Sequence, residues 1–128
     1  MAADRTISSG GPWEAVVGYS RAVVVGPWVL VSGSTATVDG ELRHVGDAYG
    51  QTIEAFGVVR RALEQAGMTL DDVVRTRMYL ADMAHEADVA RAHSELFDHV
   101  RPAATMVGIS GFVNKDMLIE VEVDAYRA

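Results

Sequence analysis

The chain has 128 residues, 49% hydrophobic and 23% charged, which is the composition of one globular domain. It contains no Cys, so disulfides, thiol nucleophiles and thiolate metal sites are excluded, and this usage fits a reducing cytoplasm. The net charge of −7 disfavours a nucleic-acid partner, because phosphate backbones are repelled. No signal peptide is recognisable at the start, and no apolar run reaches the roughly 18 residues that a membrane span needs.

The N-terminal part predicts an arm followed by a hairpin. Residues 1–12 are small, polar and Gly-rich, and we expect a flexible arm there, followed by a single domain over residues 13–128. The Val-rich run 16–25 and the run 28–32 are separated by Gly26-Pro27, which predicts a β-hairpin. The Asp39-Gly40 pair predicts a further tight turn.

The middle of the chain has helical periodicity. A long helix is predicted from an Asp47 cap to a Gly67 end, with an inner stripe of Thr52, Phe56, Val59, Leu63 and Ala66. A second helix is predicted from about His85 to Phe97, with an inner stripe of Val89, Ala90, His93, Leu96 and Phe97.

Three further segments predict strands. Residues 104–109 follow Pro102, which favours an extended chain before it. Residues 73–80 place Val74, Thr76, Met78 and Leu80 on one face, and Arg75, Arg77 and Tyr79 on the other. Residues 117–126 alternate most cleanly, with Ile119, Val121, Val123 and Ala125 opposite to Glu120, Glu122, Asp124 and Tyr126.

The predicted order is β-β-α-β-α-β-β, an α+β fold with two helices packed on one face of a mixed sheet. The other face then carries Arg75 and Arg77 beside the carboxylates of residues 120–124, a favourable cross-strand arrangement. A broad uncovered face that also bears Tyr79 and Tyr126 indicates subunits packing there, so we expect an oligomer.

Four stretches in this order resemble the RidA (YjgF) family: WVLVSG at 28–33, QAGMTLDDVVRTRMYL at 65–80, RPAATMV at 101–107 and DMLIEVEVDA at 116–125. The resemblance runs from about Trp13 to Ala125. It implies a chorismate-mutase-like fold and a homotrimer with a central barrel and ligand clefts between subunits. It also implies hydrolysis of reactive 2-imino or enamino acids to 2-oxo acids and ammonia, with no cofactor.

Several site residues carry over from the family motif. The resemblance implies that Tyr19 and the backbone of Gly33 line the cleft, and that Glu120 helps to hold the attacking water. Ala104 stands where deaminating members have an Arg that grips the substrate carboxylate. Thr105 and Met106 are expected to line the same cleft.

Other arginines could supply the missing charge. Arg101 lies three residues upstream of Ala104, although an odd separation in an extended chain points it to the opposite face. Arg21, Arg75 and Arg77 are further candidates without a motif. The Asn that active members often carry in the second helix matches Ala90 here.

Structural roles compete with these functional ones. Glu120 could instead be an interface carboxylate paired with Arg75 or Arg77. Glu14 and Arg21 form either an interface ion pair or a cleft rim, and we predict the ion pair. His93 is predicted to be a buried, satisfied histidine. No metal site is expected, because the His residues lack the helical i, i+4 spacing and no Cys assists them.

The loss of an Arg at position 104 decides the functional prediction. A charge-assisted hydrogen bond is worth about 1.5–3 kcal/mol, so a 2-imino acid should bind poorly without it. We therefore expect a small-metabolite binder that hydrolyses another reactive imine or enamine, not a generic 2-imino acid deaminase. The alternative is a non-catalytic binding or regulatory trimer, and a ribonuclease role is disfavoured by the acidic charge.

Overall fold

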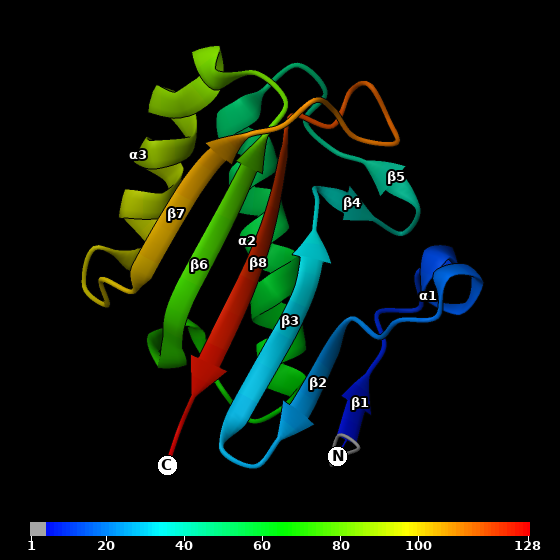
Figure 1. The fold of residues 1–128 in the computed structure, drawn as a ribbon, viewed down its shortest axis with the longest axis vertical. Helices are drawn as coiled ribbons and strands as arrows, with labels where there is room; N and C mark the ends of the chain where they lie inside the picture. Colours follow the sequence, from blue (N-terminus) through cyan, green and yellow to red (C-terminus); the bar gives the residue numbers. More distant parts are fainter. Residues whose placement is uncertain (1–4) are drawn as a thin grey trace.

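The computed structural model, which describes residues 5–128, contains a six-stranded mixed sheet in the order β1-β2-β3-β8-β6-β7 (Figure 1). Only β6 and β7 pair in parallel; the other neighbours are antiparallel. The sheet strands are β1 (Arg5–Ile7), β2 (Ala22–Val25), β3 (Trp28–Ser34), β6 (Val73–Leu80), β7 (Ala103–Gly108) and β8 (Ile119–Tyr126). A small separate hairpin pairs β4 (Thr37–Val38) with β5 (Glu41–Leu42).

Two helices, α2 (Ala48–Gln65) and α3 (Glu86–Phe97), lie together behind the sheet in Figure 1. A short helix, α1 (Pro12–Val17), stands apart at the β1 side, and two 3₁₀ turns cover Leu70–Asp72 and Met83–His85. The α+β arrangement, with its two main helices on one face of a mixed sheet, confirms the predicted fold.

Both ends of α2 follow the sequence prediction. The Asp47 carboxylate accepts a hydrogen bond from the Gly50 backbone N–H at 2.9 Å, which satisfies one of the free donors at the helix start. Gly67 lies just beyond the last turn with φ of +80°, a conformation that favours glycine.

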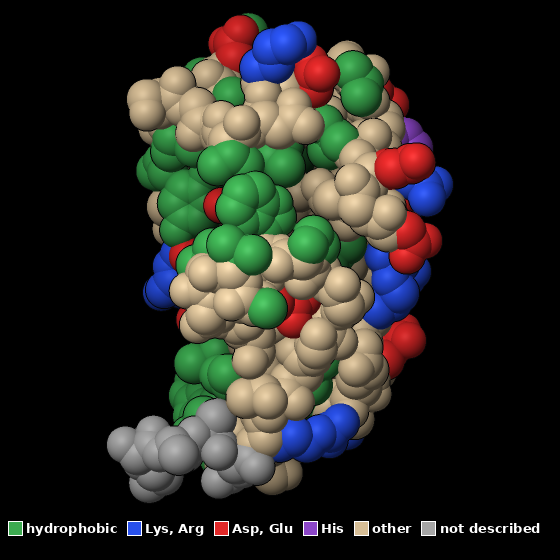
Figure 2. All heavy atoms as spheres, turned by 90° about the vertical axis from the view of Figure 1, so that its right-hand side faces the viewer, with side chains coloured by type: hydrophobic (Ala, Val, Ile, Leu, Met, Phe, Trp, Pro, Cys, Tyr) green, Lys and Arg blue, Asp and Glu red, His purple; other side chains and the backbone are tan. Residues whose placement is uncertain are grey.

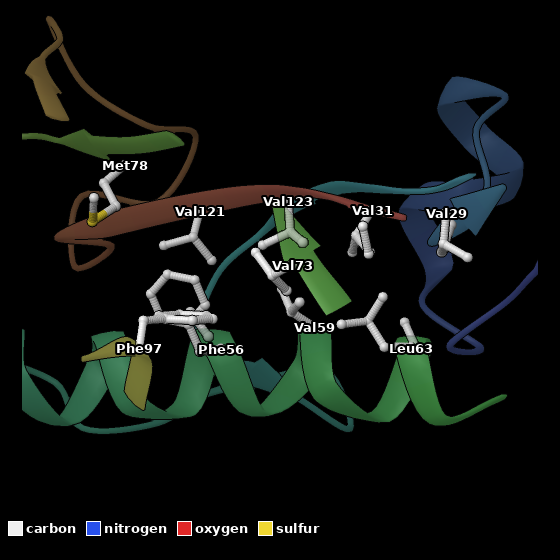
Figure 3. Close-up of a cluster of buried hydrophobic side chains, with 14 of the residues drawn as sticks. Val29, Val31, Phe56, Val59, Leu63, Val73, Met78, Phe97, Val121 and Val123 are labelled. Carbon is white, nitrogen blue, oxygen red and sulfur yellow. The ribbon is translucent and has the colours of Figure 1, made fainter. Parts of the chain in front are cut away.

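The core lies between α2 and the sheet (Figure 3). Phe56, Val59 and Leu63 of α2 face the sheet and are at most 1% exposed, as the helical stripe predicted. The four inward residues predicted on β8 are also fully buried, because every second side chain of a strand faces the same side. Phe97 of α3 completes this layer, at 5.1 Å between its ring centroid and that of Phe56.

The N-terminal predictions need correction. Arg5–Ile7 form β1, paired with β2, so the predicted flexible arm contains a strand; residues 1–4 of that arm lie outside the described residues. Val16 and Val17 belong to α1, not to a strand. Pro12 at the first helical turn and Gly18, with φ of +90° after the last turn, start and end this helix, and these signals outweighed the Val-rich composition.

Two inward residues were also assigned wrongly. The β6–β8 register shifts between Val73 and Arg75, so Val73 is buried and Val74 is 41% exposed. A bulge of this kind reverses the alternation on which the prediction rested. On α3, Ala90 is exposed and Ala92 is buried instead.

Candidate functional site

Glu120 lies against an irregularity of the neighbouring strand. The β3–β8 register shifts between Val31 and Ser34, which inserts one extra residue into β3. Gly33, inside this bulge, packs so closely on the Glu120 side chain that a Cβ at position 33 would stand 2.8 Å from its Cδ. A side chain at position 33 would therefore displace the Glu120 carboxylate, and the structure brings these two predicted site residues together.

The carboxylate of Glu120 is half-buried and makes no ion pair with any residue in the described range 5–128. Burial raises its pKa above the ordinary value, the Arg21 guanidinium lowers it, and the neighbouring Glu122 raises it further. A carboxylate with a raised pKa and no ion pair can exchange a proton with water or a ligand. The predicted alternative, a pair with Arg75 or Arg77, is not formed within the described chain.

Arg21 connects the remaining residues of this region. Its guanidinium donates to the Gly33 carbonyl oxygen at 2.7 Å and to the Ser34 hydroxyl at 2.9 Å. It also donates to the Tyr19 hydroxyl at 3.1 Å and lies 5.3 Å from the centre of the Tyr19 ring. Tyr19, Gly33 and Glu120 thus form one neighbourhood around the start of β2 and the end of β3.

Next to this neighbourhood the surface is hollowed over a volume of about 630 Å³. Tyr19, Ser32 and Leu30 line it, while Gly33 and Glu120 are not part of its lining. Its charged lining residues are Glu14, Arg77, Glu122 and Asp124. Figure 2 views the side of the molecule where α1 lies and shows many hydrophobic side chains around recessed carboxylates.

The charges on the open face of the sheet form the predicted cross-strand network. Arg77 lies 3.4 Å from Asp124 and 3.7 Å from Glu122. The Tyr79 hydroxyl donates to Glu122 at 2.6 Å, and this contact raises the pKa of Tyr79. Arg77 is therefore already engaged by carboxylates of its own sheet.

The residues of β7 lie away from Glu120 within one chain. The central strand β6 separates β7 from β8, and Tyr79 of β6 is the residue paired with both Glu120 and Val107. Ala104 and Thr105 are exposed, whereas Met106 packs partly against the core. The structure does not bring these three predicted cleft residues to the Glu120 neighbourhood of the same chain.

Arg101 does not turn toward Ala104. It has φ of +53°, and its guanidinium donates to the Asp98 carboxylate at 2.9 Å and to the Asp98 carbonyl at 3.1 Å. This contact directs the side chain to the end of α3, and with a positive φ the residue is not part of the extended chain on which the predicted direction rested.

Glu14 and Arg21 form no ion pair with each other within one chain. The buried Glu14 carboxylate accepts hydrogen bonds from the Ser9 hydroxyl at 2.6 Å and from backbone N–H groups of Ser9 and Gly11. Burial opposes its charge, but these hydrogen bonds prevail and lower its pKa. The turn before α1 satisfies Glu14 locally, which leaves Arg21 to the site, and charge patterning alone could not separate these two arrangements.

His93 is confirmed as a structural histidine. Its Nε2 lies 2.9 Å from the Thr76 hydroxyl, its ring packs against Phe56 and Phe97, and burial lowers its pKa. Among residues 5–128 no three metal-ligating side chains converge. No helix in that range is long and apolar enough to cross a membrane.

Comparison with curated proteins identifies relatives over nearly the whole chain. The family model described as endoribonuclease L-PSP matches residues 12–127. An uncharacterised protein of Streptomyces coelicolor is 44% identical over 96% of this chain and 92% of its own length. A 3-aminoacrylate deaminase of Acinetobacter baylyi is 36% identical over 61% of each chain.

Solved structures agree with this comparison. A YjgF/YER057c/UK114 family member from Mycobacterium tuberculosis superposes with a TM-score of 0.87 at 41% identity, covering 96% of this chain and 98% of its own. The YjgF protein of E. coli has a TM-score of 0.85 at 26% identity, covering 98% of this chain and 100% of its own. This chain therefore belongs to the endoribonuclease L-PSP family, which is the YjgF/RidA family.

Proposed function

We propose that this protein is a cytoplasmic homotrimer that binds a small metabolite in clefts between subunits and hydrolyses a reactive imine or enamine there. The observation that carries the proposal is the half-buried Glu120 carboxylate, which has no ion pair in the described chain and contacts the Gly33 bulge. A relative named as a 3-aminoacrylate deaminase supports this class of substrate.

The proposed reaction needs only water and a proton acceptor. The water oxygen bonds to the imine carbon while Glu120 accepts a proton from that water. This proton goes to the nitrogen, which gives a carbinolamine. Glu120 then takes the proton of the new hydroxyl group and passes it to the nitrogen, so that the C–N bond breaks, the carbonyl forms and neutral ammonia leaves. One imine and one water give one carbonyl compound and one ammonia, so no redox cofactor is involved.

The oligomeric part of the proposal rests on the uncovered face of the sheet. Trp28, Leu30 and Tyr126 are each about 40% exposed there, which is a large apolar area for a surface that stays in water. The β7 residues predicted to line the cleft lie across β6 from Glu120. A cleft shared between subunits would let the β7 residues of one chain approach the Glu120 of another.

The substrate is proposed to differ from a simple 2-imino acid. Ala104 offers no charge for a substrate carboxylate, Arg101 is bonded to Asp98, and Arg77 is paired with Glu122 and Asp124. An imine or enamine without a carboxylate on the reacting carbon does not need a free arginine to bind that carboxylate.

A direct assay tests the activity. A 2-imino acid and a carboxylate-free imine are each generated in situ by an oxidase, and their decay is followed with and without the protein. We expect faster decay of the carboxylate-free imine only. Glu120→Gln should lower this rate about 100-fold, because it removes the general base.

Glu64→Gln is the matched control, since Glu64 forms an exposed ion pair with Arg60 on α2. It should keep the full rate. Decay at the spontaneous rate for both imines, or a Glu120→Gln variant as active as the control, would contradict the proposed hydrolysis.

A second candidate is a non-catalytic binding or regulatory trimer. It is favoured by the absence of a charged residue at position 104, where the family grips its substrate. A small molecule that co-purifies and is released unchanged, together with no turnover on a panel of imines, would support it. Ribonuclease activity, which the family description mentions, is not proposed because the net charge is −7.

A further inference from the structure

Arg21 is a buried arginine, and all of its hydrogen-bond partners belong to the candidate site. Its side chain is only 7% exposed, and its two terminal nitrogens donate to Gly33, Ser34 and Tyr19. A buried guanidinium is stable only when its charge and its donors are met by fixed partners. Here the Gly33 carbonyl oxygen, the Ser34 hydroxyl and the Tyr19 hydroxyl, all of them neutral, accept its hydrogen bonds.

Those partners use three of the five N–H donors of Arg21 and carry no charge to balance its own. Its Nε is buried without a hydrogen-bond partner in the described chain. Its charge is felt by Glu120, where the guanidinium opposes the pKa increase that burial and Glu122 cause. The other groups around Glu120 are the Gly33 backbone on β3 and Tyr79 on β6, and the nearby Arg77 is bound by Glu122 and Asp124.

We propose that Arg21 is a positioning residue of this site: its guanidinium fixes the Gly33 bulge and the Tyr19 hydroxyl beside Glu120 and supplies positive charge to this neighbourhood. The inference rests on the proposed function for its meaning, but it concerns an arrangement that exists without any substrate. Arg21 acts through Tyr19, Gly33 and Glu120 and does not itself bind the ligand, because its side chain is only 7% exposed and is not among the residues that line the hollow.

The contact with Tyr19 also determines the ligand group that this residue can receive. The Tyr19 oxygen accepts a hydrogen bond from Arg21, so its own proton is free to be donated outward. Tyr19 is 36% exposed and lines the hollow. The ligand atom that meets the Tyr19 proton is therefore a hydrogen-bond acceptor, such as an imine nitrogen or a carbonyl oxygen.

Carboxyl titration by NMR tests the role of Arg21 without needing a substrate. The protein is labelled with ¹³C at the Glu carboxyl and Tyr Cζ carbons, and Glu120→Gln and Tyr19→Phe assign the two resonances. In Arg21→Gln we expect the pKa of Glu120 to rise further, because the opposing charge is lost. In Arg21→Lys, which keeps a charge, the increase should be smaller.

Arg60→Gln is the control, because it removes an exposed arginine from α2 and should leave the Glu120 titration unchanged. A folded Arg21→Gln variant whose Glu120 titrates as in the parent protein overturns the proposal. If Arg21→Gln does not fold, Arg21→Lys provides the test. The lysine ammonium cannot reach all three acceptors, so the chemical shift of the Tyr19 Cζ resonance should change. An unchanged chemical shift overturns the proposal.

Turnover separates this inference from the proposed function. If imines are hydrolysed, Arg21→Gln should lose activity, to a smaller extent than Glu120→Gln, and the pH profile should shift toward higher pH. If no imine is hydrolysed by the parent protein, the titration still supports or refutes the positioning role. If the parent protein hydrolyses an imine and the pH profile of Arg21→Gln is unshifted, the positioning role of Arg21 is contradicted while the proposed function stands.

Discussion

At the scale of single residues, the decisive feature is the Glu120 carboxylate, whose half-buried position disfavours the ionised form. Burial raises the pKa of Glu120, and only Arg21 opposes this. Similar groups on the same strand are treated differently, since Glu122 and Asp124 face Arg77. Strand β8 therefore carries two acidic residues that form ion pairs and one that does not, and the alternation of apolar and acidic residues in the sequence could not distinguish them.

The raised pKa of Glu120 makes a prediction about stability. In the unfolded chain this carboxyl titrates near its ordinary value, and in the folded chain it titrates higher, so the folded state binds more protons between the two values. Its contribution to stability therefore falls as the pH rises from the unfolded pKa through the folded pKa. Glu120→Gln should raise the free energy of unfolding at neutral pH and flatten this part of the pH dependence.

Urea unfolding at a series of pH values measures this effect at fixed protein concentration. Glu64→Gln should retain the pH dependence of the parent protein, because Glu64 is exposed. A Glu120→Gln variant that is less stable at neutral pH than the parent would show that the ionised carboxylate is satisfied in the fold.

At the scale of elements, the sequence correctly predicted the helices and strands whose periodicity, composition and end residues all indicate the same structure. Helix α2 has an apolar stripe, an Asp47 cap and a Gly67 end, and β8 has an unbroken alternation. The failures occur where signals conflict, as in α1, where Val-rich composition competes with Pro12 and Gly18. They also occur at Val74, where a bulge adds one residue and no local pattern announces it.

Gly57 in the middle of α2 leads to a prediction about helix stability. An added Cβ would meet the Arg61 and Glu54 side chains at 3.6 Å, which is ordinary contact, and the backbone does not require a glycine. Gly57→Ala should therefore stabilise the protein by about 0.5–1 kcal/mol, since alanine restricts the unfolded chain more. Urea unfolding measures the gain.

Gly50 of the same helix is the matched control, because a Cβ there would come within 2.4 Å of the capping Asp47 carboxylate. Gly50→Ala should destabilise the protein. Equal effects of the two substitutions would mean that helix propensity alone, and not local space, determines the outcome.

At the scale of the whole molecule, the sheet has one covered face and one open face. The two main helices and the core lie on one side (Figures 1 and 3). The other side carries the charge network together with exposed apolar side chains. The sequence was sufficient to predict this division. It could not predict which predicted cleft residues meet within one chain, because the order of strands in the sheet places β6 between the strand of Ala104 and the strand of Glu120.

Leu30 tests whether the open face is an interface. It is 41% exposed on β3 and lies between Val23 and Asp124 in the ladder. If this face is covered by other copies, Leu30→Lys should convert the proposed trimer to monomer, because a buried unpaired ammonium is strongly unfavourable. Light scattering after size-exclusion chromatography measures the mass.

Ala87→Lys is the control, since Ala87 is an exposed residue of α3, which lies on the opposite side of the sheet. It should leave the mass unchanged. A Leu30→Lys variant with the mass of the parent would place the interface elsewhere or show that the protein is a monomer.

The bulge in β3 has a consequence for how this site could be gained or lost. Val31 pairs with Val123 and Ser34 pairs with Val121, so the irregularity consists of a single surplus residue between two correctly aligned stretches. Deleting that residue would restore an unbroken ladder without shifting any other pair. The architecture therefore does not depend on the site: a relative could lose one codon at this position, keep the same fold, and no longer hold a backbone turn against Glu120.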